Sequence, residues 1–158
     1  MKENKMTLTF DAMPINEGFA RSVVASFCVQ AGPTVDEISD IKTAVSEAVT
    51  NCIVHAYQKS NQGKIKIVTK VKAKEIEIEV IDGGIGIDDI EKARQPFFTT
   101  LPGEERSGMG FTVMESFMDS VSVVKNASGG ITVKMKKRID STPIEMGVCE
   151  DVVKRANI

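Results

Sequence analysis

The stretch VSEAVTNCIVHAY, residues 45–57, has the spacing of an amphipathic helix with an unusual polar face. Glu47, Asn51 and His55 follow one another at four-residue steps, so they lie side by side on a helix. Lysine would be a more ordinary choice for a solvated face, whereas this one presents a carboxylate and a carboxamide together. For the pair alone a solvated face is the simpler interpretation, and a catalytic or binding row is the alternative.

The helix that carries this row is predicted to begin after Thr34, because Thr34 and Glu37 have the spacing of a capping box. Gly32 and Pro33 lie just before it and would end an earlier helix over residues 16–30. The face expected to pack in the core consists of Ile38, Ile41, Val45, Ala48, Val49, Cys52 and Ala56.

Five short segments alternate apolar and polar residues with the period of two that is typical of strands. They cover residues 7–11, 64–72, 75–80, 121–125 and 131–136. The last four segments form two hairpins, and a short helix near residues 111–118 precedes the second hairpin. Hairpins with helices grouped elsewhere predict an α/β two-layer sandwich, in which helices pack on one face of a mainly antiparallel, mixed sheet.

The composition is that of an ordinary globular protein. The chain has 158 residues, of which 42% are apolar, and a formal net charge of -2 with both signs mixed along its length. We therefore expect a single domain over residues 1–158, with no direct binding to nucleic acid or membranes. The N-terminus lacks the apolar core of a signal peptide, which predicts a cytoplasmic protein. The tail over residues 141–158 shows no packing pattern, and a mobile tail is one interpretation.

The three cysteines show no pattern of a metal site. Cys28, Cys52 and Cys149 form no CxxC pair and no Cys/His cluster with metal-ligand spacing. We expect reduced thiols, two of them in the core, and neither a zinc site nor a disulfide scaffold.

A glycine-rich motif, VIDGGIGI, follows the third predicted strand at residues 80–87. Asp-Gly is a common turn dipeptide, so a plain turn is one interpretation. The other is a base-binding site. Asp82 could accept a hydrogen bond from an exocyclic amine such as that of adenine, while Gly84 and Gly86 let the backbone approach the ligand.

A second glycine motif, RSGMGF, enters a predicted helix at residues 106–111. Free backbone N–H groups at a helix start attract phosphate, and Arg106 could add a positive charge, although a plain N-terminal turn is the commoner explanation. With a phosphate present, Asn51 could ligate Mg²⁺ and Glu47 could accept a proton from an attacking hydroxyl. We interpret His55 as a packing residue.

The motifs occur in an order that resembles a known family. A helical E-x-x-x-N, a D-x-G-x-G at a strand end, and a long loop that closes in G-x-G before a helix are similar to the ATP-binding domain of Hsp90, gyrase B, MutL and histidine kinases. This resemblance covers residues 36–136 and implies ATP and Mg²⁺. Within that superfamily the stretches DEISDIKTAVSEAVTN, EKARQPFFTT and ERSGMGFTVMESFMD resemble the short anti-sigma serine kinases of sporulation.

The resemblance implies a homodimer that binds and inhibits a sigma factor and phosphorylates a serine of an anti-anti-sigma factor. It assigns Glu47 as the base, Asn51 as the metal ligand, Asp82 as the adenine contact and Arg21 as a partner-binding residue. The nucleotide contacts and the lid over the phosphates would comprise Gly84, Gly86, Thr99, Thr100, Arg106, Ser107, Gly108 and Gly110. Two alternatives stay open: a nucleotide-gated sigma-binding module without catalysis, and an anti-sigma kinase of the general stress response.

Overall fold

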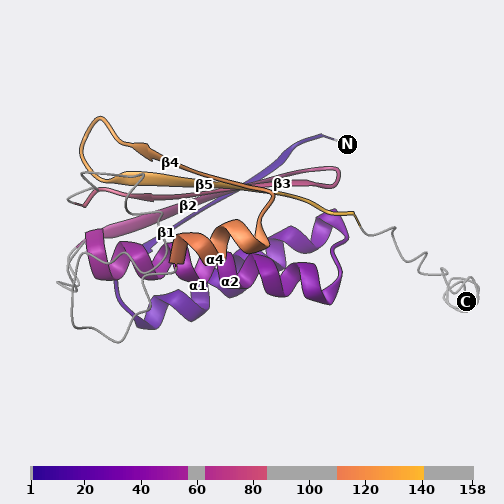
Figure 1. Ribbon diagram of the computed structural model, residues 1–158, viewed down its shortest axis with the longest axis horizontal. Coiled ribbons are helices and arrows are strands. Elements are labelled where there is room, and N and C mark those ends of the chain that lie inside the picture. Colours follow the sequence, from indigo (N-terminus) through magenta and orange to yellow (C-terminus); the bar gives the residue numbers. More distant parts are fainter. Residues whose placement is uncertain (1, 57–62, 85–109, 141–158) are drawn as a thin grey trace, which may run out of the picture.

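The computed structural model of the chain describes residues 2–56, 63–84 and 110–140, which form one sheet with helices on one face (Figure 1). The strands are β1 (Asn4–Asp11), β2 (Lys64–Lys72), β3 (Glu75–Asp82), β4 (Ser120–Lys125) and β5 (Ile131–Arg138). Their spatial order is β1-β2-β3-β5-β4, and every neighbouring pair is antiparallel. The predicted two-layer sandwich is confirmed, and within the described residues the sheet has no parallel pair.

The helical layer lies beneath the sheet in Figure 1. Its elements are α1 (Ile15–Cys28), the 3-10 turn η1 (Val29–Ala31), α2 (Val35–Asn51), the π-helical turn η2 (Cys52–Ala56) and α4 (Gly110–Phe117). The central helix is α2, which packs against both α1 and α4. In the parts of the chain that the structure describes, no helix has the length and apolar character needed to cross a membrane.

The start of α2 has the predicted capping box. The Glu37 backbone N–H donates to the Thr34 hydroxyl over 3.2 Å, and the Thr34 N–H donates to the Glu37 carboxylate over 2.7 Å. The preceding turn ends at Gly32, whose φ of 70° is in the left-handed region where glycine is favoured. The boundary between the first two helices is therefore set by local chemistry, as the sequence predicted.

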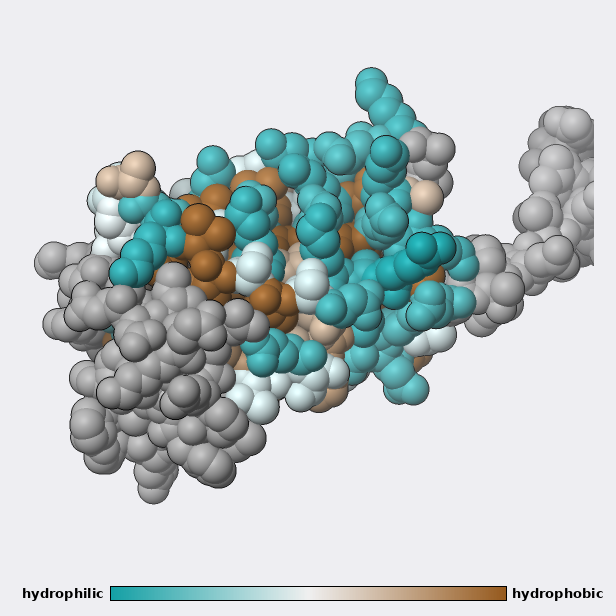
Figure 2. Space-filling view, turned by 45° about the horizontal axis from the view of Figure 1, so that its top comes forward, coloured by the Kyte–Doolittle hydropathy of each residue, from teal (hydrophilic) through white to brown (hydrophobic). Residues whose placement is uncertain are grey.

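The core lies between the sheet and the apolar stripe of α2. Ile41, Val45, Ala48 and Val49 are fully buried against the inward side chains of β2, β3 and β5. The outer face of the sheet carries charged side chains, among them the ion pair between Lys136 and Glu77, and Figure 2 shows how hydrophilic residues predominate there. One face of the sheet is thus available for packing, and the helices cover it.

We expect Thr34→Ala to lower the free energy of unfolding by ~1 kcal/mol, the usual value of an N-cap residue. The change removes the acceptor for the Glu37 N–H while leaving the core untouched. Urea denaturation measures the loss. Thr43→Ala is the control, because the Thr43 hydroxyl donates to the Ser39 carbonyl within the same helix. Equal stability of the two variants would contradict a stabilising role for the cap.

Candidate active site

Glu47 and Asn51 lie on the last turns of α2 and face the start of α4. A Cβ placed on Gly110 would lie 3.1 Å from Glu47 Oε2 and 3.1 Å from Asn51 Nδ2. Any larger residue at this position would press on both polar groups, so glycine allows the first turn of α4 to approach them. The structure therefore brings the polar row of α2 and the end of the second glycine motif together, although the two are far apart in sequence.

The arrangement at Gly110 suits a phosphate and its counter-ion. The first turn of a helix leaves backbone N–H groups without intrahelical acceptors, and the helix dipole adds positive potential there. Glu47 and Asn51 are half-buried on the adjoining helix, which presents one carboxylate and one amide oxygen at the same place. A carboxylate, an amide oxygen and the N–H groups of a helix start are thus grouped.

The base-reading candidate, Asp82, is the last residue of β3 and is only 3% exposed. Its Oδ1 accepts hydrogen bonds from the backbone N–H groups of Gly84, over 3.0 Å, and Ile131, over 3.3 Å. Its Oδ2 lies 3.6 Å from the Cys52 Sγ, which donates to it. Burial raises the pKa of Asp82 above its ordinary value, and these three hydrogen bonds oppose the rise.

Gly84 makes its close approach to another part of the chain rather than to open space. A Cβ on Gly84 would lie 2.3 Å from the carbonyl oxygen of Ala56, the last residue of η2. The close approach that this glycine allows therefore joins the end of β3 to the turn that follows α2. That turn is π-helical, which the sequence did not predict, and His55 lies within it rather than on a regular α-helix.

Sequence reasoning missed the turn between β4 and β5 as part of the site. The Asn126 side-chain amide donates to the Asp82 carbonyl over 2.8 Å, and its oxygen accepts from the Thr132 hydroxyl over 2.7 Å. Gly130 has a φ of 74°, and a Cβ there would lie 2.3 Å from the Asp82 carbonyl oxygen. The Gly129-Gly130 pair was the available signal, because two adjacent glycines in a hairpin indicate a close approach as well as a turn.

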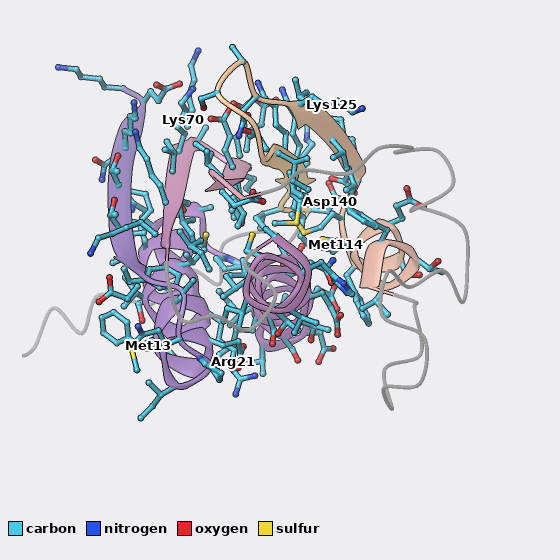
Figure 3. The ribbon with its side chains drawn as sticks, turned by 90° about the vertical axis from the view of Figure 1, so that its left-hand side faces the viewer. Met13, Arg21, Lys70, Met114, Lys125 and Asp140 are labelled. Atoms are coloured by element: carbon cyan, nitrogen blue, oxygen red, sulfur yellow. The ribbon has the colours of Figure 1, made fainter. Side chains whose placement is uncertain are left out.

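The other predicted site residues divide into two groups. Arg21 is on α1, and in Figure 3 it lies on the helix side of the molecule near Met13, opposite Lys70 on the outer side of the sheet. Six residues of the predicted nucleotide contacts and lid lie outside the described part of the chain, as do the tail over 141–158 and Cys149. The six are Gly86, Thr99, Thr100, Arg106, Ser107 and Gly108.

Comparison with known proteins places this geometry in a family. The model of the histidine kinase-like ATPase domain matches residues 10–137. An anti-sigma F factor of Clostridium botulinum (strain Eklund 17B / Type B) is 52% identical over 140 residues, which are 89% of this chain and 98% of the relative. The chain belongs to the anti-sigma F factors, within the histidine kinase-like ATPase domains. The anti-sigma F factor of Bacillus subtilis (strain 168) is 48% identical over 140 residues, with 89% of this chain and 96% of the relative covered.

Solved structures agree with the family at the level of the fold. The RsbU and RsbW domains of a Mycobacterium tuberculosis protein superpose with a TM-score of 0.62 at 20% identity, over 86% of this chain and 32% of theirs. Because the identity is low, this likeness supports the arrangement of helices and strands alone. The family membership comes from the much higher identity to the anti-sigma F factors.

We expect the free energy of unfolding of the free Asp82→Asn variant, relative to that of the wild type, to increase as the pH rises. The raised pKa of Asp82 means that its ionisation costs folding free energy. The wild type is therefore favoured below the unfolded-state pKa of about 3.9, and loses that advantage as the pH rises through the folded-state pKa. The amide variant keeps an oxygen acceptor and does not ionise. Urea unfolding of both proteins, from below the unfolded-state pKa to above the folded-state pKa of Asp82, measures the difference in their free energies of unfolding.

The same variant should lose most of the thermal stabilisation by ATP, because its amide has one acceptor oxygen, for which three protein donors and the base amine would compete. A ligand at a hundred times its dissociation constant otherwise adds about 2.7 kcal/mol. Asp36→Asn, at an exposed position in the first turn of α2, is the control for both measurements. A variant stabilised by ATP as strongly as the wild type would contradict the role of Asp82 in reading the base.

Proposed function

We propose that this protein is a Mg-ATP-dependent protein serine kinase that also binds and inhibits a sporulation sigma factor. Its protein substrate would be an anti-anti-sigma factor, which phosphorylation inactivates, and both activities belong to the cytoplasm. The observation that carries the proposal is the meeting of Glu47 and Asn51 with the start of α4 at Gly110. Membership among the anti-sigma F factors supports the choice of partners.

The adenine base would bind at the Asp82 end of the site. A buried carboxylate held by two backbone N–H groups keeps a fixed orientation, and it can accept a hydrogen bond from the exocyclic amine of adenine. Guanine carries a carbonyl in that position, which would face the carboxylate oxygen without a donor. The end of β3 therefore supplies a reason for preferring ATP over GTP.

The phosphates and Mg²⁺ would bind at the Gly110 end. Among the described residues, no group of three or more His, Cys, Asp or Glu side chains is placed to hold a metal by itself. A Mg²⁺ ion commonly takes one or two protein oxygens and completes its shell with phosphate oxygens and water, so the Asn51 amide oxygen fits such a site. When bound, the ion would neutralise charge on the phosphate oxygens.

Glu47 would act as the general base in the transfer. A serine hydroxyl of the substrate protein attacks the γ-phosphorus of ATP, its proton passes to the Glu47 carboxylate, and the bond to the β-γ bridging oxygen breaks to release ADP. Asn51 would hold the metal-bound phosphates from the adjoining turn of α2. The chain's only histidine is His55, which we interpret as packing, so the phosphoryl acceptor belongs to the partner protein.

The partner surface would include Arg21 on α1. The Arg21 guanidinium is 3.4 Å from the Glu17 carboxylate, and the Arg21 side chain is 44% exposed. Two apolar side chains of the same helix, Ile15 and Phe19, are 81% and 57% exposed. Exposed apolar groups beside an arginine are typical of protein-binding surfaces, which fits a sigma factor, an anti-anti-sigma factor or the second subunit of a homodimer.

We expect Glu47→Gln to reduce serine phosphorylation of the anti-anti-sigma factor by roughly 10²- to 10⁴-fold, the usual contribution of a general base. The glutamine keeps the shape but cannot take the proton. Transfer from labelled ATP in the presence of Mg²⁺ measures the loss, and nucleotide affinity should change little. Asn51→Ala should instead weaken Mg-ATP binding, because it removes an oxygen ligand.

Glu75→Gln, at the exposed opposite end of β3, is the matched control and should transfer at the wild-type rate. Near-normal transfer by Glu47→Gln would make Glu47 an ordinary helix-surface residue. Absence of any transfer by the wild type, with sigma binding still dependent on nucleotide, would replace the kinase by a nucleotide-gated binding module. Transfer to a stress-response regulator alone would favour the general-stress alternative.

We expect Arg21→Ala to weaken sigma-factor binding about tenfold or more, equivalent to ~1.4 kcal/mol, while leaving ATP affinity unchanged. Loss of a charged anchor removes its contacts to the partner, and α1 contributes none of the described groups around Asp82 or Gly110. A binding titration with the purified sigma factor measures the effect. Arg138→Ala, at an exposed arginine on β5, is the control. Unaltered sigma affinity would exclude Arg21 from the interface.

A further inference from the structure

The thiol of Cys52 occupies a distinctive place between the two ends of the site. Cys52 directly follows Asn51, where α2 gives way to the π-helical turn η2. Its side chain is 2% exposed, and its Sγ lies 3.6 Å from Asp82 Oδ2 on the neighbouring strand. Sulfur is larger than oxygen or nitrogen, so this separation corresponds to a hydrogen bond from the thiol to the carboxylate.

The Cys52 thiol is the donor in this contact, because a carboxylate oxygen accepts and the S–H group is a weak donor. The other groups that contact the Asp82 carboxylate are the uncharged backbone N–H groups of Gly84 and Ile131.

The acceptor capacity of Asp82 is nearly used up. A carboxylate offers about four acceptor positions, two on each oxygen. Among the described residues, Gly84 and Ile131 donate to Oδ1, and Cys52 donates to Oδ2. The described donors leave one position, on Oδ2 beside the thiol, for a ligand donor.

We propose that Cys52 is a positioning and specificity residue that aims the last acceptor position of Asp82 at the exocyclic amine of an adenine nucleotide. This inference rests on the proposed nucleotide-binding function and deepens it. The backbone donors hold one carboxylate oxygen, and the thiol limits rotation of the other. Cys52 also directly follows Asn51 in the chain. The groups at the adenine end and at the phosphate end of the proposed site are therefore held by the same turn.

The test compares Cys52→Ala with Cys52→Ser, because serine differs from alanine only by a hydroxyl that can donate. The free protein with Mg²⁺ is titrated with ATP and with purine riboside triphosphate, which lacks the 6-amine. Cys52→Ala should bind ATP about tenfold more weakly, as expected for one lost hydrogen bond to a charged group. Its affinity for the amine-free nucleotide should stay at the wild-type value, and Cys52→Ser should recover most of the ATP affinity.

Cys28→Ala is the matched control, since Cys28 is a buried free thiol on α1, and it should bind both nucleotides as the wild type does. Equal ATP affinity of Cys52→Ala and wild type would overturn the inference alone. An equal loss for both nucleotides, or a serine variant as weak as alanine, would assign Cys52 a packing role instead. A wild type that binds neither nucleotide, or does not prefer ATP, would overturn the base assignment and this inference with it.

A second measurement uses the native thiol and needs no change at Cys52. The S–H stretching band in the infrared spectrum moves to lower frequency when the thiol donates to a strong acceptor. In a background with Cys28→Ala and Cys149→Ala, Asp82→Asn should move the Cys52 band to higher frequency, because an amide accepts more weakly than a carboxylate. An unmoved band would show that the thiol does not donate to Asp82 and would overturn the inference.

Discussion

The carboxylate of Asp82 has almost no contact with water, and a buried charge is stable only when donors replace the water that it has lost. These donors come from the residues after β3, from the start of β5 and from the end of α2. The requirement for three donors therefore brings the ends of three elements to one point. The residual cost is the raised pKa of this group, which the fold tolerates at the place where a ligand would contribute one donor more.

Helix α2 serves the core and the site with opposite faces. Its apolar stripe is buried beneath the sheet, and its polar row carries Glu47 and Asn51 toward Gly110. Because both faces belong to one rigid helix, packing against the sheet also fixes the orientation of the polar groups. Cys52, which follows directly at the end of α2, contacts Asp82, so a single segment contacts both ends of the site.

Local patterns in the sequence predicted most of the fold, since helix and strand periods depend on neighbouring residues. The capping box at Thr34, the buried stripe of α2 and both hairpins followed from such patterns. The hydrogen bonds from Asn126 and Ile131 to Asp82 could not be predicted in this way. Asn126 and Ile131 lie 44 and 49 residues beyond Asp82, and contacts at that separation leave no periodic trace.

The prediction of the site divides in the same manner. The proximity of Glu47 and Asn51 follows from their four-residue spacing alone, whereas their approach to Gly110 was suggested only by the order of motifs in a known family. The π-helical turn was missed because residues 52–56 continue the apolar spacing of an ordinary helix. The end of this turn lies close to Gly84, a tertiary contact that sequence spacing does not record.

The strand order has a consequence for the time at which the molecule becomes functional during synthesis. β5 is the last described strand to leave the ribosome, yet it occupies the position between β3 and β4. Until it arrives, β4 has no described neighbour in the sheet and β3 presents an open edge, a state prone to wrong pairing. Asp82 likewise lacks the donors from Asn126 and Ile131 at that stage. A nascent chain therefore completes its sheet and the hydrogen bonds around Asp82 in the same step.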